Sequence, residues 1–85
     1  MNKNVIIYTS SLCGYCYHAK SLLKRKSIPY NEINVDLNNE KRNEMVKKSN
    51  GRTSVPQIFF KNHHIGGCDD LFKLEKDNGL EFLKN

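Results

Sequence analysis

The hydrophobic positions in the first half of the chain predict a strand, a helix and a second strand. Residues 5–8 form a continuous apolar run rich in β-branched side chains, which is typical of a buried central strand. Apolar residues then recur at helical spacing within 19–23, and the helix is expected to end before Pro29. Residues 30–35 carry apolar side chains at 30, 33 and 35, which indicates a short second strand.

The second half begins with another helix and continues with a hairpin. Asp36 or Asn38 is a suitable cap for a helix that ends at Asn50-Gly51. Residues 57–60 and 63–65 flank a short polar turn, the pattern of a β-hairpin. After the glycine pair at 66–67, Asp69 or Asp70 is expected to open a last helix that ends at Asn78-Gly79.

These elements give an α/β chain in the order β-α-β-α-β-β-α. The first crossover helix implies a parallel strand pair, and the late hairpin implies an antiparallel pair. We therefore predict a four-stranded mixed sheet flanked by three helices. With 85 residues, the chain is too short for two independent cores, so we expect one domain covering 1–85.

The chain has a net charge of +5, which raises the question of nucleic-acid binding. Basic residues gather in 20–26 and 41–48, where they alternate with apolar residues as on the exposed faces of helices. No recognised nucleic-acid motif accompanies them, so we do not expect a nucleic-acid partner. A positive surface does attract anionic small molecules and acidic proteins.

The apolar runs are too short for a membrane span or a signal peptide. The N-terminal run covers only 5–8, against roughly 20 residues for a span and roughly 7–15 for a signal sequence. We therefore expect a cytoplasmic protein without membrane association. The reducing cytosol disfavours a structural disulfide.

The motif CGYC places Cys13 and Cys16 two residues apart before the first helix. A zinc site needs four protein ligands, or three and a water. The other candidate ligands, His63, His64 and Cys68, form no second close pair. The two histidines are consecutive in a strand and therefore point to opposite faces. We expect no protein-only metal site.

The alternative is a reactive thiol pair. With Cys13 at the cap, residues 14–17 form the first helical turn, whose unpaired N–H groups carry partial positive charge. That field favours the thiolate, which is the attacking species in disulfide exchange. Cys16 lies one turn further along the same face, within reach of Cys13 but less exposed. The spacing indicates a redox-active pair in which Cys13 attacks and Cys16 resolves.

Three segments together resemble the glutaredoxin family, in its short bacterial form: YTSSLCGYC, GRTSVPQIFF and HIGGCDDL. Thioredoxin is a poorer match because its CGPC motif and its tryptophan are absent, with Leu12 in the tryptophan position. The resemblance implies a thioredoxin-like fold. It also implies a monomeric, glutathione-dependent thiol–disulfide oxidoreductase that reduces protein disulfides and protein–glutathione mixed disulfides.

The resemblance also implies where glutathione would bind. The residues it indicates are Tyr15, Arg42, Ser54, Val55, Pro56, Gly67, Cys68, Asp69 and Asp70. The family has a cis proline at Pro56, and Val55 pairs through its backbone with the cysteinyl part of glutathione. The N–H groups of Cys68 and Asp69 would hold the γ-glutamyl carboxylate.

Several of these roles have alternatives. Asp69 or Asp70 either accepts the γ-glutamyl ammonium or only caps the helix, and the Cys68 thiol is expected to be packed. Arg42 either binds the glycine carboxylate or is a solvated surface residue.

The chain departs from the family pattern at two positions. Many relatives have lysine where this chain has Ser10, and the CPYC form has proline where this chain has Gly14. Some relatives with a small residue at the Gly14 position hold a [2Fe–2S] cluster between two protomers with two glutathiones. A cluster carrier or sensor is therefore the alternative function.

Overall fold

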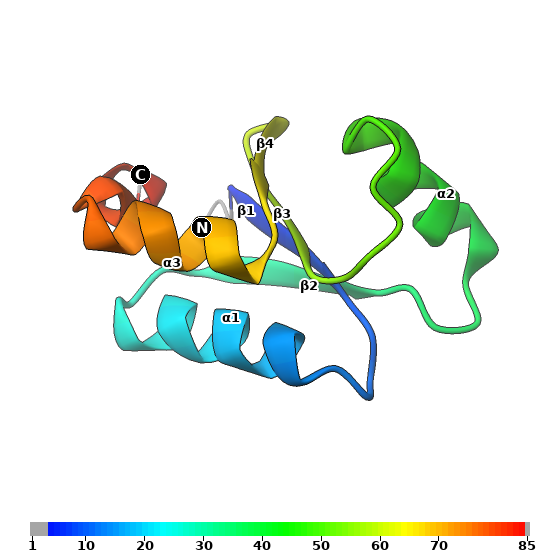
Figure 1. Ribbon diagram of the computed structural model, residues 1–85, viewed down its shortest axis with the longest axis horizontal. Coiled ribbons are helices and arrows are strands. Elements are labelled where there is room, and N and C mark those ends of the chain that lie inside the picture. Colours follow the sequence, from blue (N-terminus) through cyan, green and yellow to red (C-terminus); the bar gives the residue numbers. More distant parts are fainter. Residues whose placement is uncertain (1–3, 85) are drawn as a thin grey trace.

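The computed structural model describes residues 4–84 and forms a layered α/β structure around one sheet (Figure 1). In chain order the elements are β1 (Val5–Thr9), α1 (Gly14–Arg25), β2 (Tyr30–Asn34), α2 (Asn39–Lys48), β3 (Gln57–Phe60), β4 (His63–Gly66), α3 (Cys68–Lys76) and the 3-10 helix η1 (Gly79–Lys84). The sheet order is β2-β1-β3-β4. β1 pairs parallel with β2 and antiparallel with β3, and β3 pairs antiparallel with β4. The predicted mixed four-stranded sheet is confirmed.

The sheet separates two hydrophobic clusters because successive strand side chains point to opposite faces. On one face Val5 and Ile7 pack with the buried side of α1, with α3 and with η1. On the other face Tyr8 packs with Phe59 and with Met45 of α2. Figure 1 shows α2 across the sheet from α1 and α3. This arrangement leaves the N-terminal ends of α1 and α3 near the same edge of the sheet.

The helix boundaries confirm part of the prediction and correct the rest. Asn38 caps α2, and its side chain accepts the N–H of Lys41 at 3.1 Å. The N-cap of α3 is Gly67, whereas Asp69 and Asp70 lie in the first turn. The expectation that one of these aspartates opens the helix from the cap position was wrong. Glycine is itself an accepted N-cap residue, so the helix can begin directly after the glycine pair.

A second correction concerns the C-terminal end. The sequence predicted no element after Asn78-Gly79, yet η1 follows there. Its Leu80 and Leu83 are buried in the cluster that contains α1 and α3. A spacing of three residues places both side chains on one side of a 3-10 helix. Within residues 4–84, no helix has the length and apolar character needed to cross a membrane.

Candidate active site

The thiol of Cys13 lies at the start of α1, as the sequence predicted. Cys13 is the N-cap residue, and its Sγ accepts the N–H of Cys16 at 3.1 Å. The first turn of α1 contains no acidic residue, so no carboxylate of that turn opposes negative charge on the sulfur. The thiol is partly exposed. The positive end of α1 therefore points at a sulfur that a substrate can reach.

Cys16 is buried behind Cys13, with a relative exposure of 1%. Burial, followed by the hydrogen bond with Cys13, raises the pKa of the Cys16 thiol to about 12. Both cysteines are free thiols in the structure. Cys16 is thus protonated near neutrality and shielded from large substrates, whereas Cys13 is partly exposed.

A small charged network lies one turn further along α1. The Lys20 ammonium forms an ion pair with Glu32 of β2 at 3.0 Å. Glu32 also accepts the hydroxyl of the buried Thr9 at 2.7 Å. The Thr9 hydroxyl and then Lys20 hold the pKa of Glu32 below its ordinary value, against the opposing effect of burial. The positive charge of Lys20 also has a small lowering effect on the pKa of Cys16.

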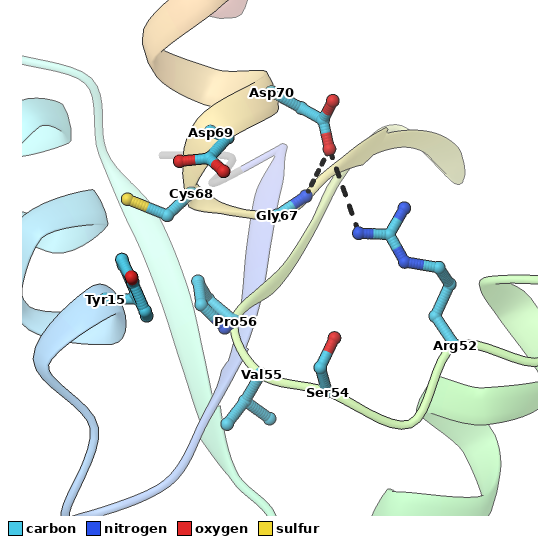
Figure 2. Close-up of a pocket in the computed structure, with 9 residues that line it drawn as sticks. All are labelled: Tyr15, Arg52, Ser54, Val55, Pro56, Gly67, Cys68, Asp69 and Asp70. Carbon is cyan, nitrogen blue, oxygen red and sulfur yellow. Dashed lines mark hydrogen bonds and ion pairs between the residues drawn. The ribbon is translucent and has the colours of Figure 1, made fainter.

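A cavity of about 510 Å³ lies between the start of α1 and the start of α3 (Figure 2). Its lining comes from the start of α1, the loop before β3 and the turn into α3: Tyr15, Arg52, Ser54, Val55, Pro56, Gly67, Cys68, Asp69 and Asp70. The Cys13 thiol lies 3.7 Å from the carbonyl oxygen of Val55, which places the sulfur at the edge of the cavity. This volume is in the usual range for small-molecule sites.

The structure brings together all the residues that the resemblance implied for glutathione except Arg42. The Val55–Pro56 peptide bond is cis, as the resemblance also implied. Arg42 lies on α2 and is not among the cavity residues. It lies instead close enough to Asp36 to influence that carboxyl. Hydrogen bonds from the Ser11 backbone and from the Ser10 and Ser11 hydroxyls lower the pKa of Asp36, and the charge of Arg42 adds a smaller lowering effect.

Arg52 is the cavity residue that the sequence analysis missed. Its Nη2 lies 3.9 Å from the Asp70 carboxylate, at the opposite side of the cavity from Tyr15 (Figure 2). The available signal was its place in GRTSVPQIFF, two residues before Ser54. Arg52 supplies a cation to the cavity, which Arg42 does not.

The two aspartates of α3 differ in their partners. Asp70 accepts the N–H of Gly67 at 2.9 Å and thereby caps the helix. A side chain at Gly66 would collide with this arrangement, because its Cβ would lie 2.2 Å from Asp70 Oδ2. Within residues 4–84, no hydrogen bond or ion pair engages the carboxylate of Asp69, which is exposed. Asp69 is therefore available to a ligand, while Asp70 already has a structural role.

A family model described as Glutaredoxin matches residues 5–65 of the chain. The chain belongs to the glutaredoxin family. It is 53% identical to Glutaredoxin 3 of Escherichia coli K12 over 80 residues, covering 94% of this chain and 95% of that protein. Glutaredoxin 1 of Rickettsia prowazekii is 50% identical over 88 residues, covering 98% and 93% respectively.

Solved glutaredoxin structures have the same fold. The glutaredoxin of Brucella melitensis superposes with a TM-score of 0.81 at 48% identity, covering 94% of this chain and 86% of that one. A buckwheat glutaredoxin–glutathione complex gives a TM-score of 0.84 at 25% identity, covering 94% and 74%. At the level of the family, the chain is a glutathione-dependent thiol oxidoreductase with a thioredoxin-like fold.

The metal sites considered for this chain are a zinc site within one chain and a [2Fe–2S] cluster between two chains. Within residues 4–84, no three side chains of His, Cys, Asp or Glu gather as ligands for one ion. The [2Fe–2S] cluster that the resemblance implied as an alternative would instead lie between two protomers with two glutathiones. Cys13 is the partly exposed thiol that could serve as a ligand to it, and the cluster function stays a prediction.

Proposed function

We propose that this glutaredoxin reduces protein disulfides and protein–glutathione mixed disulfides, with Cys13 as nucleophile and Cys16 as resolving thiol. The observation that carries the proposal is the asymmetry of the pair. Cys13 Sγ accepts a helix N–H and is partly exposed, whereas Cys16 is buried with a pKa raised to about 12. The thiolate is the attacking form, so Cys13 attacks first.

Reduction of a protein disulfide uses both thiols. The Cys13 thiolate attacks one sulfur of the substrate, a mixed disulfide forms, and the other substrate sulfur leaves as a thiolate and takes a proton. Cys16 then loses its proton and attacks the sulfur of Cys13. The Cys13–Cys16 disulfide forms, and the second substrate sulfur leaves. Two electrons have passed to the substrate, and two glutathiones restore the dithiol and become oxidised glutathione.

Reduction of a glutathionylated protein needs only Cys13. Its thiolate attacks the glutathione sulfur, the protein thiol leaves, and a Cys13–glutathione disulfide forms. A second glutathione thiolate attacks the glutathione sulfur of that disulfide. Oxidised glutathione leaves, and the Cys13 thiolate is restored.

The cavity beside Cys13 is the proposed binding site for the glutathione part of these intermediates. The backbone of Val55 pairs with the cysteinyl unit. The N–H groups of Cys68 and Asp69 at the start of α3 hold the γ-glutamyl carboxylate, and the free Asp69 carboxylate accepts its ammonium group. Arg52, in place of Arg42, is the cavity cation suited to the glycine carboxylate.

Two variants test the assignment of roles. Cys13→Ser should abolish reduction of both a glutathionylated protein and a protein disulfide, because a serine hydroxyl is almost never ionised near neutrality. Cys16→Ser should retain deglutathionylation and lose most protein-disulfide reduction. Both rates are measured with glutathione, recycled through a coupled reductase. Retained deglutathionylation in Cys13→Ser, together with its loss in Cys16→Ser, would reverse the roles.

The cluster function has one structural feature in its favour. A Cβ built at Gly14, the residue after Cys13, meets no atom within 4 Å outside its chain neighbours and its own helix backbone, so the space at Gly14 is open. Protein purified anaerobically in the presence of glutathione distinguishes the two functions. We expect a colourless monomer. A brown dimer that loses its colour in Cys13→Ser would establish the cluster.

A further inference from the structure

A chain of polar contacts lies behind the wall of the cavity. Gln57, the first residue of β3, has a relative exposure of 0%. Its Nε2 donates to the backbone oxygen of Ser54 at 3.0 Å and to the Ser54 hydroxyl oxygen at 3.3 Å. Its Oε1 lies 2.8 Å from Nε2 of His64 on β4. The chain therefore runs from β4 through buried β3 to a residue that lines the cavity.

The carbonyl of Ser54 fixes the direction of every donor in this chain. A carbonyl oxygen can only accept, so the NH₂ end of the Gln57 amide must face it. The oxygen end then faces His64, and the His64 Nε2 must carry the proton. The His64 ring is held in place by stacking on Phe59, with ring centres 4.8 Å apart and planes at 29°. His64 is thus a packed hydrogen-bond donor on β4.

The same chain leaves the proton of the Ser54 hydroxyl free. The hydroxyl oxygen already accepts from Gln57, and no acceptor within residues 4–84 takes its proton. Figure 2 shows this oxygen directed into the cavity, on the side that Arg52 also enters. A hydroxyl donor beside a guanidinium suits an anionic acceptor such as a carboxylate.

We propose that Gln57 and His64 are positioning residues that hold the Ser54 hydroxyl as a donor to a carboxylate of glutathione. Neither residue lines the cavity, so each acts through Ser54. This role depends on the proposed glutathione site. Gln57 and His64 would make the Ser54 hydroxyl a donor to the ligand rather than an acceptor from it. Without the amide of Gln57, the hydroxyl can turn its proton toward other acceptors, and the ligand loses a preset donor.

The first test compares Gln57→Met with Ser54→Ala and with the double variant. Each single variant should raise the KM for glutathione about 3- to 10-fold, the range for one hydrogen bond. Turnover with dithiothreitol, measured on the same samples, normalises for damage to the fold. The double variant should be no worse than Ser54→Ala, because both changes remove the same donor. Additive losses, or an unchanged KM in Ser54→Ala, would overturn the inference.

A pair of substitutions at His64 tests the same chain without changing the buried amide. His64→Phe keeps an aromatic ring over Phe59 but removes the donor to Gln57, so the KM for glutathione should rise as in Gln57→Met. His64→Gln restores an N–H donor and should return the KM toward the wild-type value. Equal losses in both variants, or equal losses with glutathione and dithiothreitol, would show that His64 only supports packing. A wild-type chain that turns over no glutathione would overturn the proposed function as well.

Discussion

The two helix starts that border the cavity present cysteines in opposite electrostatic settings. Cys13 caps α1, whose first turn has no acidic residue. Cys68 is the first residue of α3, whose first turn contains Asp69 and Asp70. Burial and then the negative charge of Asp69 raise the pKa of the Cys68 thiol. Both sulfurs lie near the positive end of a helix, yet only Cys13 is partly exposed and has no carboxylate in the first turn of its helix.

We infer that a helix N-terminus does not by itself make a thiol reactive, because burial and the neighbouring Asp69 carboxylate oppose it at Cys68. The field of the helix falls off within one turn, so side chains of that turn strengthen or cancel it. In the proposed glutathione site the start of α3 has a different use: its backbone N–H groups would bind an anion, and Asp69 would bind a cation. Under this proposal, one helix start serves catalysis on one wall of the cavity and another serves recognition on the opposite wall.

The largest expected effect is a difference in alkylation rate among the three cysteines. Iodoacetamide at neutral pH should modify Cys13 much faster than Cys16 or Cys68, because the latter two are buried and have raised pKa values. Peptide mass spectrometry at several times gives the three rates. Unfolding in guanidinium should make the rates similar. Fast modification of Cys68 in the folded protein would contradict the comparison.

The second prediction separates the two aspartates of α3. Asp69→Ala should lower glutathione-dependent turnover roughly 10- to 150-fold, the range for a hydrogen bond to a charged group. Asp70→Ala removes the cap of Gly67 and should lower the free energy of unfolding by about 1 kcal/mol. Thermal unfolding and turnover with both glutathione and dithiothreitol measure the two effects.

The matched control for Asp69 is the reductant. Dithiothreitol lacks the γ-glutamyl group, so the ratio of glutathione to dithiothreitol turnover should fall in Asp69→Ala. An unchanged ratio would mean that Asp69 makes no contact with glutathione. In that case the acidic turn of α3 would serve only the helix.

The smallest expected effect concerns Lys20. Its charge lowers the pKa of Cys16 by a minor amount, so Lys20→Met should raise that pKa further. Resolution by Cys16 should slow a few-fold near neutrality, in the range of a partly exposed charge pair, and its pH profile should move to higher pH. Lys20→Arg should keep the wild-type profile. Single-turnover release of a protein thiol measures the rate at which Cys16 resolves the mixed disulfide. An unchanged pH profile in Lys20→Met would show that Lys20 does not influence this step.

The redox half of the site was predictable because it is local. Cys13, Cys16 and the start of α1 lie in one short segment, so spacing and helix-capping rules suffice. The mixed character of the sheet followed from the strand and helix order, because a crossover helix joins parallel strands and a hairpin joins antiparallel ones. The 3-10 helix η1 was missed because Asn78-Gly79 is a valid stop signal. The burial of Leu80 and Leu83 against α1 and α3 explains why this segment forms a helix.

The recognition half depended on residues distant in sequence. The resemblance indicated the loop before β3 and the turn into α3, and the structure brings both to one cavity. It also favoured Arg42, whereas the fold places Arg52 in the cavity. No local pattern distinguishes the two arginines, because their positions depend on how α2 and the loop before β3 pack on the sheet. The role of His64 is likewise visible only through its contacts with Gln57 and Phe59.

The most direct test of the central claim is the site at which glutathione attaches to the protein. Cys16→Ser protein is incubated with oxidised glutathione, and its peptides are analysed by mass spectrometry without reduction. The account predicts one glutathionyl group, on Cys13, with Cys68 unmodified, and its complete release by added glutathione. Glutathione attached to Cys68 while Cys13 stays free would contradict the assignment of the nucleophile.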